Sequence, residues 1–442
     1  MAGIFKAYDI RGIYGEDLTE AIAHDIGRAF ADRFKLQTVA VGHDMRTHSQ
    51  PLFDAMAAGL AKQGATVYDL GLCSTPMTYF ATGHLQTDAG IIITASHNTG
   101  EWNGCKLCLR NAVPVSGATG IQDIEAAVRQ GQFQAPAAEP GEIRDYPIQA
   151  KYAEHIRPEA ALQRPLRIAA DMANSMGIIE SAILRELMSI DALYDELDGA
   201  FPNHEANPLK FETYAALQEK VRSGSYDFGV AFDGDADRVG FTDEKGNIIP
   251  MDLITALIAQ DLLCHTKGTV LYDLRSSRAV KEVIAENGGN PVMCRVGHSF
   301  IKQQMRETDA IFAGELSGHY YFRLGEVCAE SSALAVLRIA NIVSAADKPL
   351  SEIIAPLQRY QASGEINSEV ENTEAVLARL KTTYADGKQF ELDGLSVDYP
   401  DWWFNVRCSN TEPLIRLNTE ASNQTDMEKH RDELLAIIRG QS

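Results

Sequence analysis

Three aspartates at alternate positions form a dense group of side chains that could bind a metal. Asp233, Asp235 and Asp237 follow the mainly apolar run 226–232, and Arg238 comes next. Carboxylates crowded in this way repel one another unless a cation lies between them, and Mg²⁺ at ~2.0–2.1 Å suits a few carboxylates plus a phosphate oxygen. The pattern therefore predicts a metal site at the end of a strand, with the Arg238 guanidinium available to a phosphate.

Three other interpretations of this loop stay open. An EF-hand would place the aspartates at loop positions 1, 3 and 5 and Glu244 at position 12. Its sharp turn needs glycine at position 6, where this sequence has Arg238, and the preceding run resembles a strand rather than a helix. An aspartyl-phosphate phosphatase also carries Asp-x-Asp at a strand end, although the third carboxylate and Arg238 favour a metal cage. A solvated acidic turn is the alternative without chemistry.

A serine at the tip of another apolar strand is a candidate covalent carrier. The run 90–93 stops abruptly at small and hydroxyl residues, which places Ser96 at a strand tip. A serine in this position can accept a group and pass it on. Lys106 lies ten residues further on and can return to the same site. A polar turn rich in Ser, Asn and Gly explains the composition equally well.

Two further loops carry groups that suit sugars and phosphates. In the segment 309–320 a strand leads to Glu315, Ser317 and His319, which offer a carboxylate, a hydroxyl and an imidazole to sugar hydroxyls. The segment 404–416 places two arginines around a Ser-Asn-Thr turn, which is typical of a phosphate nest. The residues of this nest are Arg407, Ser409, Asn410, Thr411 and Arg416. A surface turn is the simpler explanation of each loop taken alone.

The elements that position these loops recur along the chain. Short apolar runs at 38–42, 166–170 and 269–272 each lead to an aspartate and a polar turn. After the first run, Ser49 is the expected N-cap of a helix. Strand–turn–helix repetition predicts α/β domains with largely parallel sheets, in which ligands bind at the carboxyl ends of strands. Three similar openings predict three related domains.

Length, charge and cysteine content limit the classes of function. The 442 residues correspond to roughly three domains, or four, at ~150 residues each. A net charge of −21 argues against a nucleic acid or an acidic membrane as partner. The sequence has no run of ~18 apolar residues, and segment 1–12 lacks the apolar core of a signal peptide. Seven scattered cysteines, with Cys105 and Cys108 as one Cys-x-x-Cys pair, argue against a disulfide framework and favour the cytoplasm.

Composition also predicts where the domains divide. A linker rich in Gln, Ala, Pro and Gly covers 129–147, a turn lies at 245–247, and a polar stretch covers 362–368. We therefore expect α/β units at 1–143 with the serine loop, 144–245 with the metal loop and 246–360 with the sugar loop, and a C-terminal phosphate-binding unit at 361–442.

Together, the four loops resemble the α-D-phosphohexomutase family, in its phosphomannomutase/phosphoglucomutase branch. The similarity runs from 6–12 to 407–416, and the motifs at 94–98, 233–238, 314–319 and 409–413 come in the family's order. Thr99 replaces a usual proline and Trp102 a common tyrosine, and neither change removes a reacting atom. The resemblance implies three related mixed α/β domains plus a smaller TBP-like α+β C-terminal domain around a central cleft.

The resemblance also implies a role for each candidate residue. Ser96 would be the phosphoserine, and one Mg²⁺ per chain would be held by Asp233, Asp235, Asp237 and a phosphoryl oxygen on Ser96. Glu315 and Ser317 would bind the sugar hydroxyls O3 and O4, and Arg407, Ser409, Asn410, Thr411 and Arg416 the phosphate that is not reacting. The other residues expected to line the cleft are Arg11, His97, Lys106, Arg238, His298 and His319, and Arg275, which replaces a frequent lysine and keeps its charge, would bind substrate. Of these, Lys106 and His319 are the candidates for proton transfer.

The implied reaction is an intramolecular phosphotransfer between hexose 6-phosphate and hexose 1-phosphate, for mannose, glucose or both. It passes through a hexose 1,6-bisphosphate, which also serves as activator. Leu316 stands where the glucosamine-specific branch more often has glutamine, which favours mannose or glucose. A phosphoglucosamine mutase, a non-catalytic phosphosugar-binding protein and a metal-dependent phosphatase stay open as alternatives, and we expect a monomer or a dimer.

Overall fold

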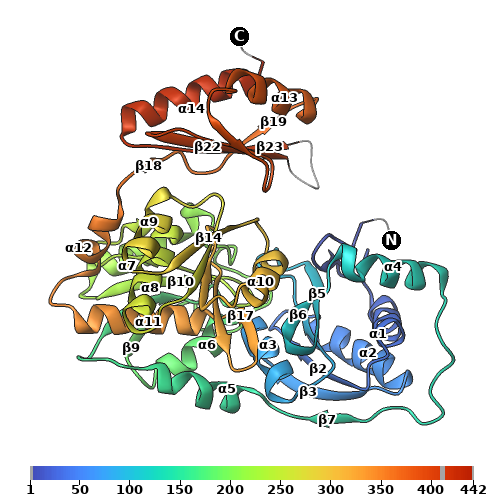
Figure 1. Cartoon of the computed structure of the whole chain (residues 1–442). Helices are drawn as coiled ribbons and strands as arrows, with labels where there is room; N and C mark the ends of the chain where they lie inside the picture. The colour runs from blue at the N-terminus through green and yellow to red at the C-terminus, as the bar shows by residue number, and fades with distance from the viewer. Residues whose placement is uncertain (1–2, 409–413, 441–442) are drawn as a thin grey trace.

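The strands of the chain form four separate sheets. The computed structural model describes residues 3–408 and 414–440. Figure 1 shows the N-terminal unit in blue and cyan, two further α/β units in green, yellow and orange beside it, and the C-terminal unit in orange and red above them. The expected class, three mixed α/β domains and a smaller C-terminal domain, is confirmed.

The first three sheets share one strand order, in which three parallel strands are followed by an antiparallel fourth. The order is β3 (Thr66–Leu72), β2 (Thr38–His43), β4 (Ala89–Ile93) and β5 (Trp102–Leu109) in the first sheet; β9 (Ser189–Leu193), β8 (Arg167–Asp171), β10 (Phe228–Phe232) and β11 (Val239–Thr242) in the second; and β14 (Asn290–Cys294), β13 (Thr269–Asp273), β15 (Phe312–Gly314) and β16 (Tyr320–Leu324) in the third. Further strands of these sheets are β1 (Ile10–Ile13), β6 (Val113–Pro114), β7 (Ile143–Asp145), β12 (Ile248–Ile249) and β17 (Val327–Glu330). The common order confirms that the three domains are related.

Helices connect and cover these sheets. In the first unit they are α1 (Glu20–Phe34), α2 (Ser49–Lys62), α3 (Thr75–His84) and α4 (Ile121–Gln130); in the second, α5 (Gln149–Ile156), α6 (Gly177–Leu184) and α7 (Ala215–Ser223). The third holds α8 (Met251–His265), α9 (Arg278–Glu286), α10 (His298–Glu307), α11 (Ser332–Ala345) and α12 (Leu350–Ile354). Short 3₁₀ turns lie at η1 (Arg110–Ala112), η2 (Gly117–Thr119), η3 (Arg157–Glu159), η4 (Phe211–Tyr214) and η5 (Ala355–Leu357).

An aspartate at the end of β2, β8 and β13, the equivalent strands of the three sheets, makes the same turn. One carboxylate oxygen of Asp44, Asp171 and Asp273 accepts the backbone N–H two residues further on, at 3.0, 2.9 and 2.7 Å respectively. Asp side chains stabilise turns in this way because they imitate a backbone acceptor. The aspartates that recur in the sequence therefore shape the edge of each sheet at which ligands are expected.

Ser49 is not the N-cap that its sequence position predicted. Helix α2 begins at Ser49 itself, and His48 occupies the N-cap position without a side-chain capping bond. The Ser49 hydroxyl instead donates to Oδ1 of Asp44 at 2.5 Å. A carboxylate is a stronger acceptor than a neutral group, so the serine supports the Asp44 turn.

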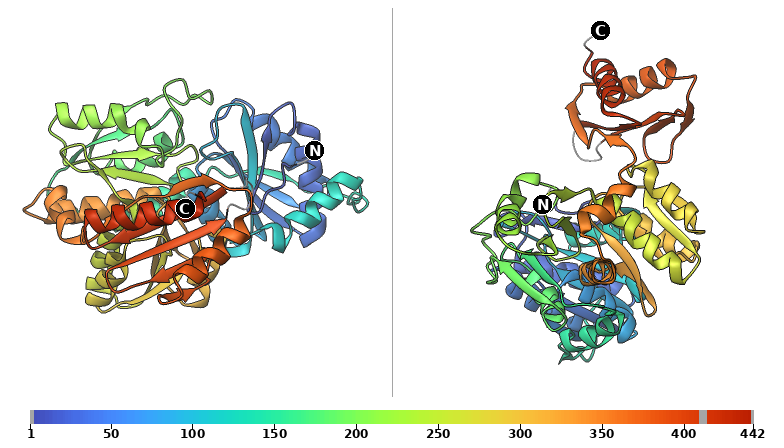
Figure 2. Two further views of the ribbon diagram at one scale, coloured as in Figure 1. Left: turned by 90° about the horizontal axis from the view of Figure 1, so that it is seen from above. Right: turned by 90° about the vertical axis from the view of Figure 1, so that its left-hand side faces the viewer.

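The first three units share a hydrophobic core, whereas the C-terminal unit has its own. One cluster of buried side chains joins Phe80 of α3, Phe232 of β10 and Phe322 of β16. The C-terminal cluster contains only residues from Val376 to Ile438. Figure 2 shows the C-terminal unit standing apart from the other three and joined to them at one side.

The C-terminal sheet is antiparallel, with strands β18 (Gln361–Ala362), β23 (Leu414–Ala421), β22 (Trp402–Cys408), β21 (Leu395–Asp398) and β20 (Lys388–Phe390) in that order, and β19 (Ile366–Glu369) also pairs with β23. Helices α13 (Thr373–Thr383) and α14 (Gln424–Ile438) cover one face (Figure 1). Leu380 and Leu434 from these helices pack with Phe404 and Leu417 of the sheet.

Two strands extend slightly beyond the domain limits expected from composition. β7 pairs with β3 of the first sheet, and β12 pairs with β11 of the second. We propose the same four units, with the first two boundaries a few residues later than 143 and 245.

Cys105 and Cys108 do not form a paired site. They are three residues apart on β5, so their side chains leave the strand on opposite faces and lie in different cores. No helix in the described ranges has the length and apolarity needed to cross a membrane.

Candidate functional site

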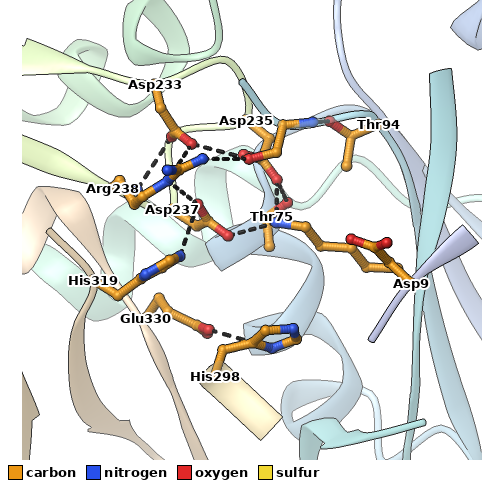
Figure 3. A network of polar contacts seen from close by, with 12 residues as sticks. Asp9, Thr75, Thr94, Asp233, Asp235, Asp237, Arg238, His298, His319 and Glu330 are labelled. Carbon is orange, nitrogen blue, oxygen red and sulfur yellow. Dashed lines mark hydrogen bonds and ion pairs between the residues drawn. The ribbon is translucent and has the colours of Figure 1, made fainter. Parts of the chain in front are cut away.

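The three reactive loops predicted from the sequence follow the same strand in each repeat. Ser96 follows β4, Asp233 follows β10 and Glu315 follows β15. Figure 3 shows the side chains of the second and third units pointing toward one another, with Asp233, Asp237 and His319 in one network. The sequence placed these residues at strand ends, and the packing of the three domains brings those ends together.

Ser96 lies against the aspartate loop of the second domain. Its hydroxyl donates to Oδ2 of Asp233 at 3.1 Å and accepts from Nη2 of Arg238 at 3.0 Å. Ser96 has a φ of 50°, in the left-handed region that side chains other than glycine rarely adopt. Strain of this kind costs about 1–3 kcal/mol and persists where surrounding contacts impose it.

The acidic loop fits a divalent cation. One carboxylate oxygen from each of Asp233, Asp235 and Asp237 lies within 4.8 Å of the others, and all three residues are buried. Oδ1 of Asp235 is buried and accepts no hydrogen bond within the described chain, and Oδ1 of Asp237 is buried with only ion pairs to His319 at 3.4 Å and Arg238 at 3.7 Å. Buried acceptors are normally satisfied, so carboxylate oxygens without a full set of hydrogen bonds in one loop point to an ion, and oxygen ligands suit Mg²⁺.

The loop is not an EF-hand, because no helix precedes or follows it closely. β10 leads into it, and β11 leaves it as an antiparallel partner of β10, with Phe232 opposite Val239. The strand–loop–strand geometry therefore leaves the metal cage as the favoured interpretation.

Two residues of the first domain hold the aspartates from the opposite side. Lys106 Nζ lies 2.6 Å from Oδ2 of Asp235 and 2.5 Å from Oδ2 of Asp237. The Thr75 hydroxyl donates to the same Asp235 oxygen at 2.6 Å (Figure 3). These bonds occupy Oδ2 and leave Oδ1 of each carboxylate for another partner. Thr75 was not predicted, because its Ser-Thr-Pro sequence indicates only the start of a helix.

The pKa values of Asp233 and Asp237 are shifted in opposite directions because the neighbours of the two carboxylates differ. Burial, with repulsion from Asp237, raises the pKa of Asp233 to about 7, against the lowering effect of Arg238. Burial alone would raise the pKa of Asp237, but Lys106 and His319 hold it well below its usual value. The pKa of Lys106 is raised although burial opposes this, because Asp235 and Asp237 stabilise the ammonium. Lys106 is therefore protonated at neutral pH.

His97 and Arg238 complete the surroundings of the serine. Arg238 donates through Nε to Oδ2 of Asp233 at 2.9 Å and through Nη2 to Nδ1 of His97. The Arg238 charge and burial hold the pKa of His97 well below its usual value, so the imidazole is neutral. Arg11 of β1 donates to Oδ1 of Asn98 at 2.8 Å in the serine loop and pairs with Asp9.

The third loop places Glu315, Ser317 and His319 beside the acidic loop. His319 Nδ1 lies 3.1 Å from Oε2 of Glu315, and its Nε2 lies 3.4 Å from Oδ1 of Asp237. Burial opposes protonation of His319, but Asp237 and Glu315 raise its pKa to about 9. The Ser317 hydroxyl contacts Nδ1 of His319 at 2.7 Å. This imidazolium therefore joins the metal loop to the loop expected to bind the sugar.

His298 and Arg275 border the same loop. His298 lies at the start of α10, where burial and Lys302 hold its pKa well below the usual value. Its Nδ1 is 3.9 Å from Oε1 of Glu330, which also pairs with the buried Lys302 at 3.0 Å. Arg275 pairs with Asp273 at 2.6 Å and lies 3.8 Å from Glu315. Both residues therefore lie beside the loop that carries Glu315, and their contact with substrate stays a prediction.

The predicted phosphate nest is only partly within the described chain. Arg407 lies on β22, one residue before its end, and Arg416 lies on β23, opposite it in the register. Ser409, Asn410 and Thr411 lie outside the described residues. A carboxylate that was not predicted, Glu365, lies 2.6 Å from Nη2 of Arg407, 3.7 Å from Nη1 of Arg416 and 3.5 Å from Nη1 of Arg275. It occurs in a polar stretch that resembles a linker, so composition gave no signal for it.

Comparisons with known proteins agree with this geometry. Four family models described as phosphoglucomutase/phosphomannomutase match in order: α/β/α domains I, II and III at residues 2–135, 150–246 and 250–360, and the C-terminal domain at 365–437. A phosphomannomutase of Escherichia coli is 37% identical, over 98% of this chain and 99% of its own.

Solved structures agree as well. A phosphoglucomutase/phosphomannomutase family protein of Burkholderia thailandensis is 30% identical with a TM-score of 0.91, over 99% of this chain and 97% of that one. The Aspergillus fumigatus N-acetylphosphoglucosamine mutase, solved in complex with GlcNAc-6P and magnesium, shares the fold at 14% identity and a TM-score of 0.65, over 98% of this chain and 94% of that one.

Proposed function

The chain belongs to the phosphoglucomutase/phosphomannomutase family and is a hexose phosphate mutase, an isomerase, and on this premise we propose that it works through a phosphoserine at Ser96. Its substrates would be mannose and glucose phosphates, interconverted between the 6- and 1-positions. The observation that carries the proposal is the 3.1 Å hydrogen bond from Ser96 to Asp233, which joins the carrier to the acidic loop across two domains.

We propose that Asp233, Asp235 and Asp237 hold one Mg²⁺, with a phosphoryl oxygen on Ser96 as a further ligand. The unpaired buried Oδ1 of Asp235 supports this, as does the magnesium present in the Aspergillus enzyme of the same fold. Bound Mg²⁺ would neutralise charge that develops on the transferred phosphoryl group. Arg238 would stabilise the same charge from the protein side, because its Nη2 already contacts Ser96 Oγ.

In the transfer, the bond between Ser96 Oγ and phosphorus breaks and a sugar hydroxyl oxygen forms the new bond to phosphorus. One proton leaves that hydroxyl, and one reaches the serine oxygen. We propose Lys106 and His319 as the groups that exchange these protons. Both are protonated at neutral pH, because the pKa of Lys106 is raised and that of His319 is about 9. One of them would donate its proton to the serine oxygen as the bond to phosphorus breaks and, neutral once it has done so, would take up the proton that leaves the sugar hydroxyl.

The sugar would lie between the loops of the third and fourth units. Glu315 and Ser317 would bind its O3 and O4 hydroxyls, whereas Arg407, Ser409, Asn410, Thr411 and Arg416 would hold the phosphate that is not reacting. Transfer to the free hydroxyl gives a hexose 1,6-bisphosphate, and transfer back from its other phosphate completes the isomerisation. Contacts at O3 and O4 do not distinguish mannose from glucose, which differ at C2, so both would react.

Intact mass spectrometry tests the carrier. After incubation with glucose 1,6-bisphosphate, the protein should gain the mass of one phosphoryl group, and excess mannose 1-phosphate should remove it. Ser96→Ala should gain nothing. An unmodified wild-type protein that still isomerises mannose 1-phosphate, or a Ser96→Ala variant that retains activity, would overturn the proposal.

Coupled assays distinguish the alternatives. Faster turnover of glucosamine 6-phosphate than of mannose 1-phosphate would indicate a phosphoglucosamine mutase. Release of inorganic phosphate without isomerisation would indicate a phosphatase. Binding of phosphosugar without turnover in the presence of glucose 1,6-bisphosphate would indicate a non-catalytic binding protein.

A further inference from the structure

A fully buried arginine holds the loop that carries Ser96. Arg46 follows the Asp44 turn of the first domain, and its side chain has no exposed surface. Its Nη2 donates to the carbonyl oxygens of Ser96 at 2.8 Å and Asn98 at 2.6 Å. Its Nη1 donates to those of Thr99 at 2.7 Å and Trp102 at 3.0 Å. One guanidinium therefore binds four carbonyl groups within seven residues of chain.

The position of Arg46 is itself fixed from two other sides. Oδ2 of Asp44 accepts from its Nε at 3.2 Å and supplies the countercharge that a buried cation needs. The ring of Phe201, which belongs to the second domain, lies 4.9 Å from the guanidinium carbon. Arg46 therefore contacts the serine loop, its own turn and the neighbouring domain.

The repeat in the fold places another arginine in the equivalent position. Arg46 is the second residue after Asp44, and Arg275 is the second residue after Asp273 in the third domain. Arg275 lies beside Glu315, and Glu315 belongs to the loop that follows β15 of the same sheet. Arg46 has the same relation to the loop of Ser96.

The second domain has Ala173 at this position and holds its loop differently. There, Ser175 donates through Oγ to the Asp233 carbonyl at 2.9 Å, and the Met176 N–H donates to the Gly234 carbonyl at 3.2 Å. All three domains thus anchor the functional loop to the turn that follows the first strand of the sheet. In the first domain Arg46 makes four of the anchoring contacts, and Nε2 of His48 adds one with the Gly100 carbonyl at 3.1 Å.

We propose that Arg46 is the positioning residue of the carrier serine, an inference that rests on the proposed role of Ser96. By binding the Ser96 carbonyl, Arg46 fixes the peptide that follows the serine and supports its left-handed φ of 50°. A trans peptide points its N–H opposite to its C=O, so the His97 N–H faces away from Arg46. Carbonyl oxygens would repel a phosphoryl group, and four of those in the serine loop accept hydrogen bonds from Arg46 instead.

The test measures phosphoryl transfer in Arg46→Met and Arg46→Lys. Each protein is phosphorylated with glucose 1,6-bisphosphate, the phosphorylated fraction is measured by intact mass, and a single turnover with mannose 1-phosphate is followed by quenched flow. For Arg46→Met we expect the rate per phosphorylated serine and kcat to fall about 100-fold, since a displacement of ~1 Å has that effect. KM should stay within about threefold, because the proposed sugar and phosphate contacts lie in other domains.

Arg46→Lys keeps the charge but replaces a planar fork with a point donor, so it should restore kcat only to within about tenfold of wild type. Arg28→Met is the matched control. Arg28 lies in the same domain, stacks 4.3 Å from the Phe133 ring and donates to the Gln134 carbonyl at 3.2 Å, away from the serine loop. It should transfer at the wild-type rate.

The outcomes separate the two proposals. A wild-type protein that transfers no phosphoryl group from Ser96 overturns the proposed function, whatever Arg46 does. A wild-type protein that transfers normally, beside a folded Arg46→Met that transfers at the same rate per phosphorylated serine, overturns the role of Arg46. If circular dichroism shows Arg46→Met to be unfolded, a wild-type transfer rate in Arg46→Lys overturns it instead.

Discussion

The Thr75 hydroxyl donates a hydrogen bond of 2.6 Å to Oδ2 of Asp235, and the Thr75 N–H donates to the Asp235 carbonyl at 3.1 Å. The first residue of α3, in the first domain, thus fixes both the backbone and the side chain of an aspartate in the second. With Oδ2 engaged, Oδ1 of Asp235 is left buried without a hydrogen bond within the described chain. Thr75 therefore orients a carboxylate that we propose as a metal ligand.

Replacing Thr75 with valine should weaken Mg²⁺ binding. Valine keeps the shape but removes the donor, and loss of an outer partner of a ligand typically costs 10–100-fold in metal affinity. Activity measured against Mg²⁺ concentration should show a half-saturation point about tenfold higher, with near-normal kcat at saturation. Thr75→Ser, which retains the hydroxyl, is the control. An unchanged half-saturation point in Thr75→Val would show that the hydroxyl does not orient the ligand.

Replacing Glu365 with glutamine should strengthen phosphate binding. Glu365 lies 2.6 Å from Arg407 and 3.5 Å from Arg275, and these arginines together with Arg416 hold its pKa below the usual value although burial opposes this. The carboxylate therefore competes with a substrate phosphate for the same cations. The Kd for mannose 1-phosphate, measured by calorimetry, should fall about threefold, as expected for a partly exposed ion pair. Weaker binding would mean that Glu365 orients Arg407 instead.

Glu180 should make stability depend on pH. This glutamate of α6 is fully buried, and burial raises its pKa to about 7 although the hydroxyl of Ser74 donates to it. A raised pKa means that the folded state holds the proton more strongly than the unfolded state. The contribution of Glu180 to the free energy of unfolding is therefore largest below the unfolded pKa of 4.5 and falls as pH rises toward 7. Above pH 7 the whole contribution, at most about 3 kcal/mol, is lost.

Glu180→Gln removes this titration while keeping an acceptor for Ser74. The variant should melt at a higher temperature than wild type at pH 8, and the difference should shrink as pH is lowered through 7 toward 4.5. Differential scanning fluorimetry across this range measures both curves. Glu154→Gln, at an exposed position of the neighbouring helix α5, is the control and should follow wild type. Parallel curves for Glu180→Gln and wild type would contradict the prediction.

The sequence was most informative where chemistry and secondary structure coincide. Aspartate, serine and glutamate directly after apolar runs predicted the three loops, because the strand ends of parallel sheets collect ligands. Long-range partners gave no such signal. Thr75 and Asp235 are 160 residues apart, and the local pattern around Thr75 indicates only a helix start. Arg46 lies in the polar turn after the apolar run 38–42, but its four carbonyl partners depend on how the serine loop folds back.

Glycine at position 234 is required for the contact between the serine and the metal loops. A Cβ added there would lie 2.0 Å from the Ser96 carbonyl oxygen, far closer than any real contact. The oxygen belongs to the backbone, so it cannot move away as the end of a flexible side chain could. Gly234→Ala should therefore push the two loops apart, lengthen the Ser96–Asp233 contact and lower kcat about 100-fold or more. Gly117→Ala, where the nearest atom would be an ordinary 3.6 Å away, is the matched control and should keep wild-type kcat. A folded Gly234→Ala variant with normal single-turnover transfer from Ser96 would show that close approach of the two loops is not needed for the reaction.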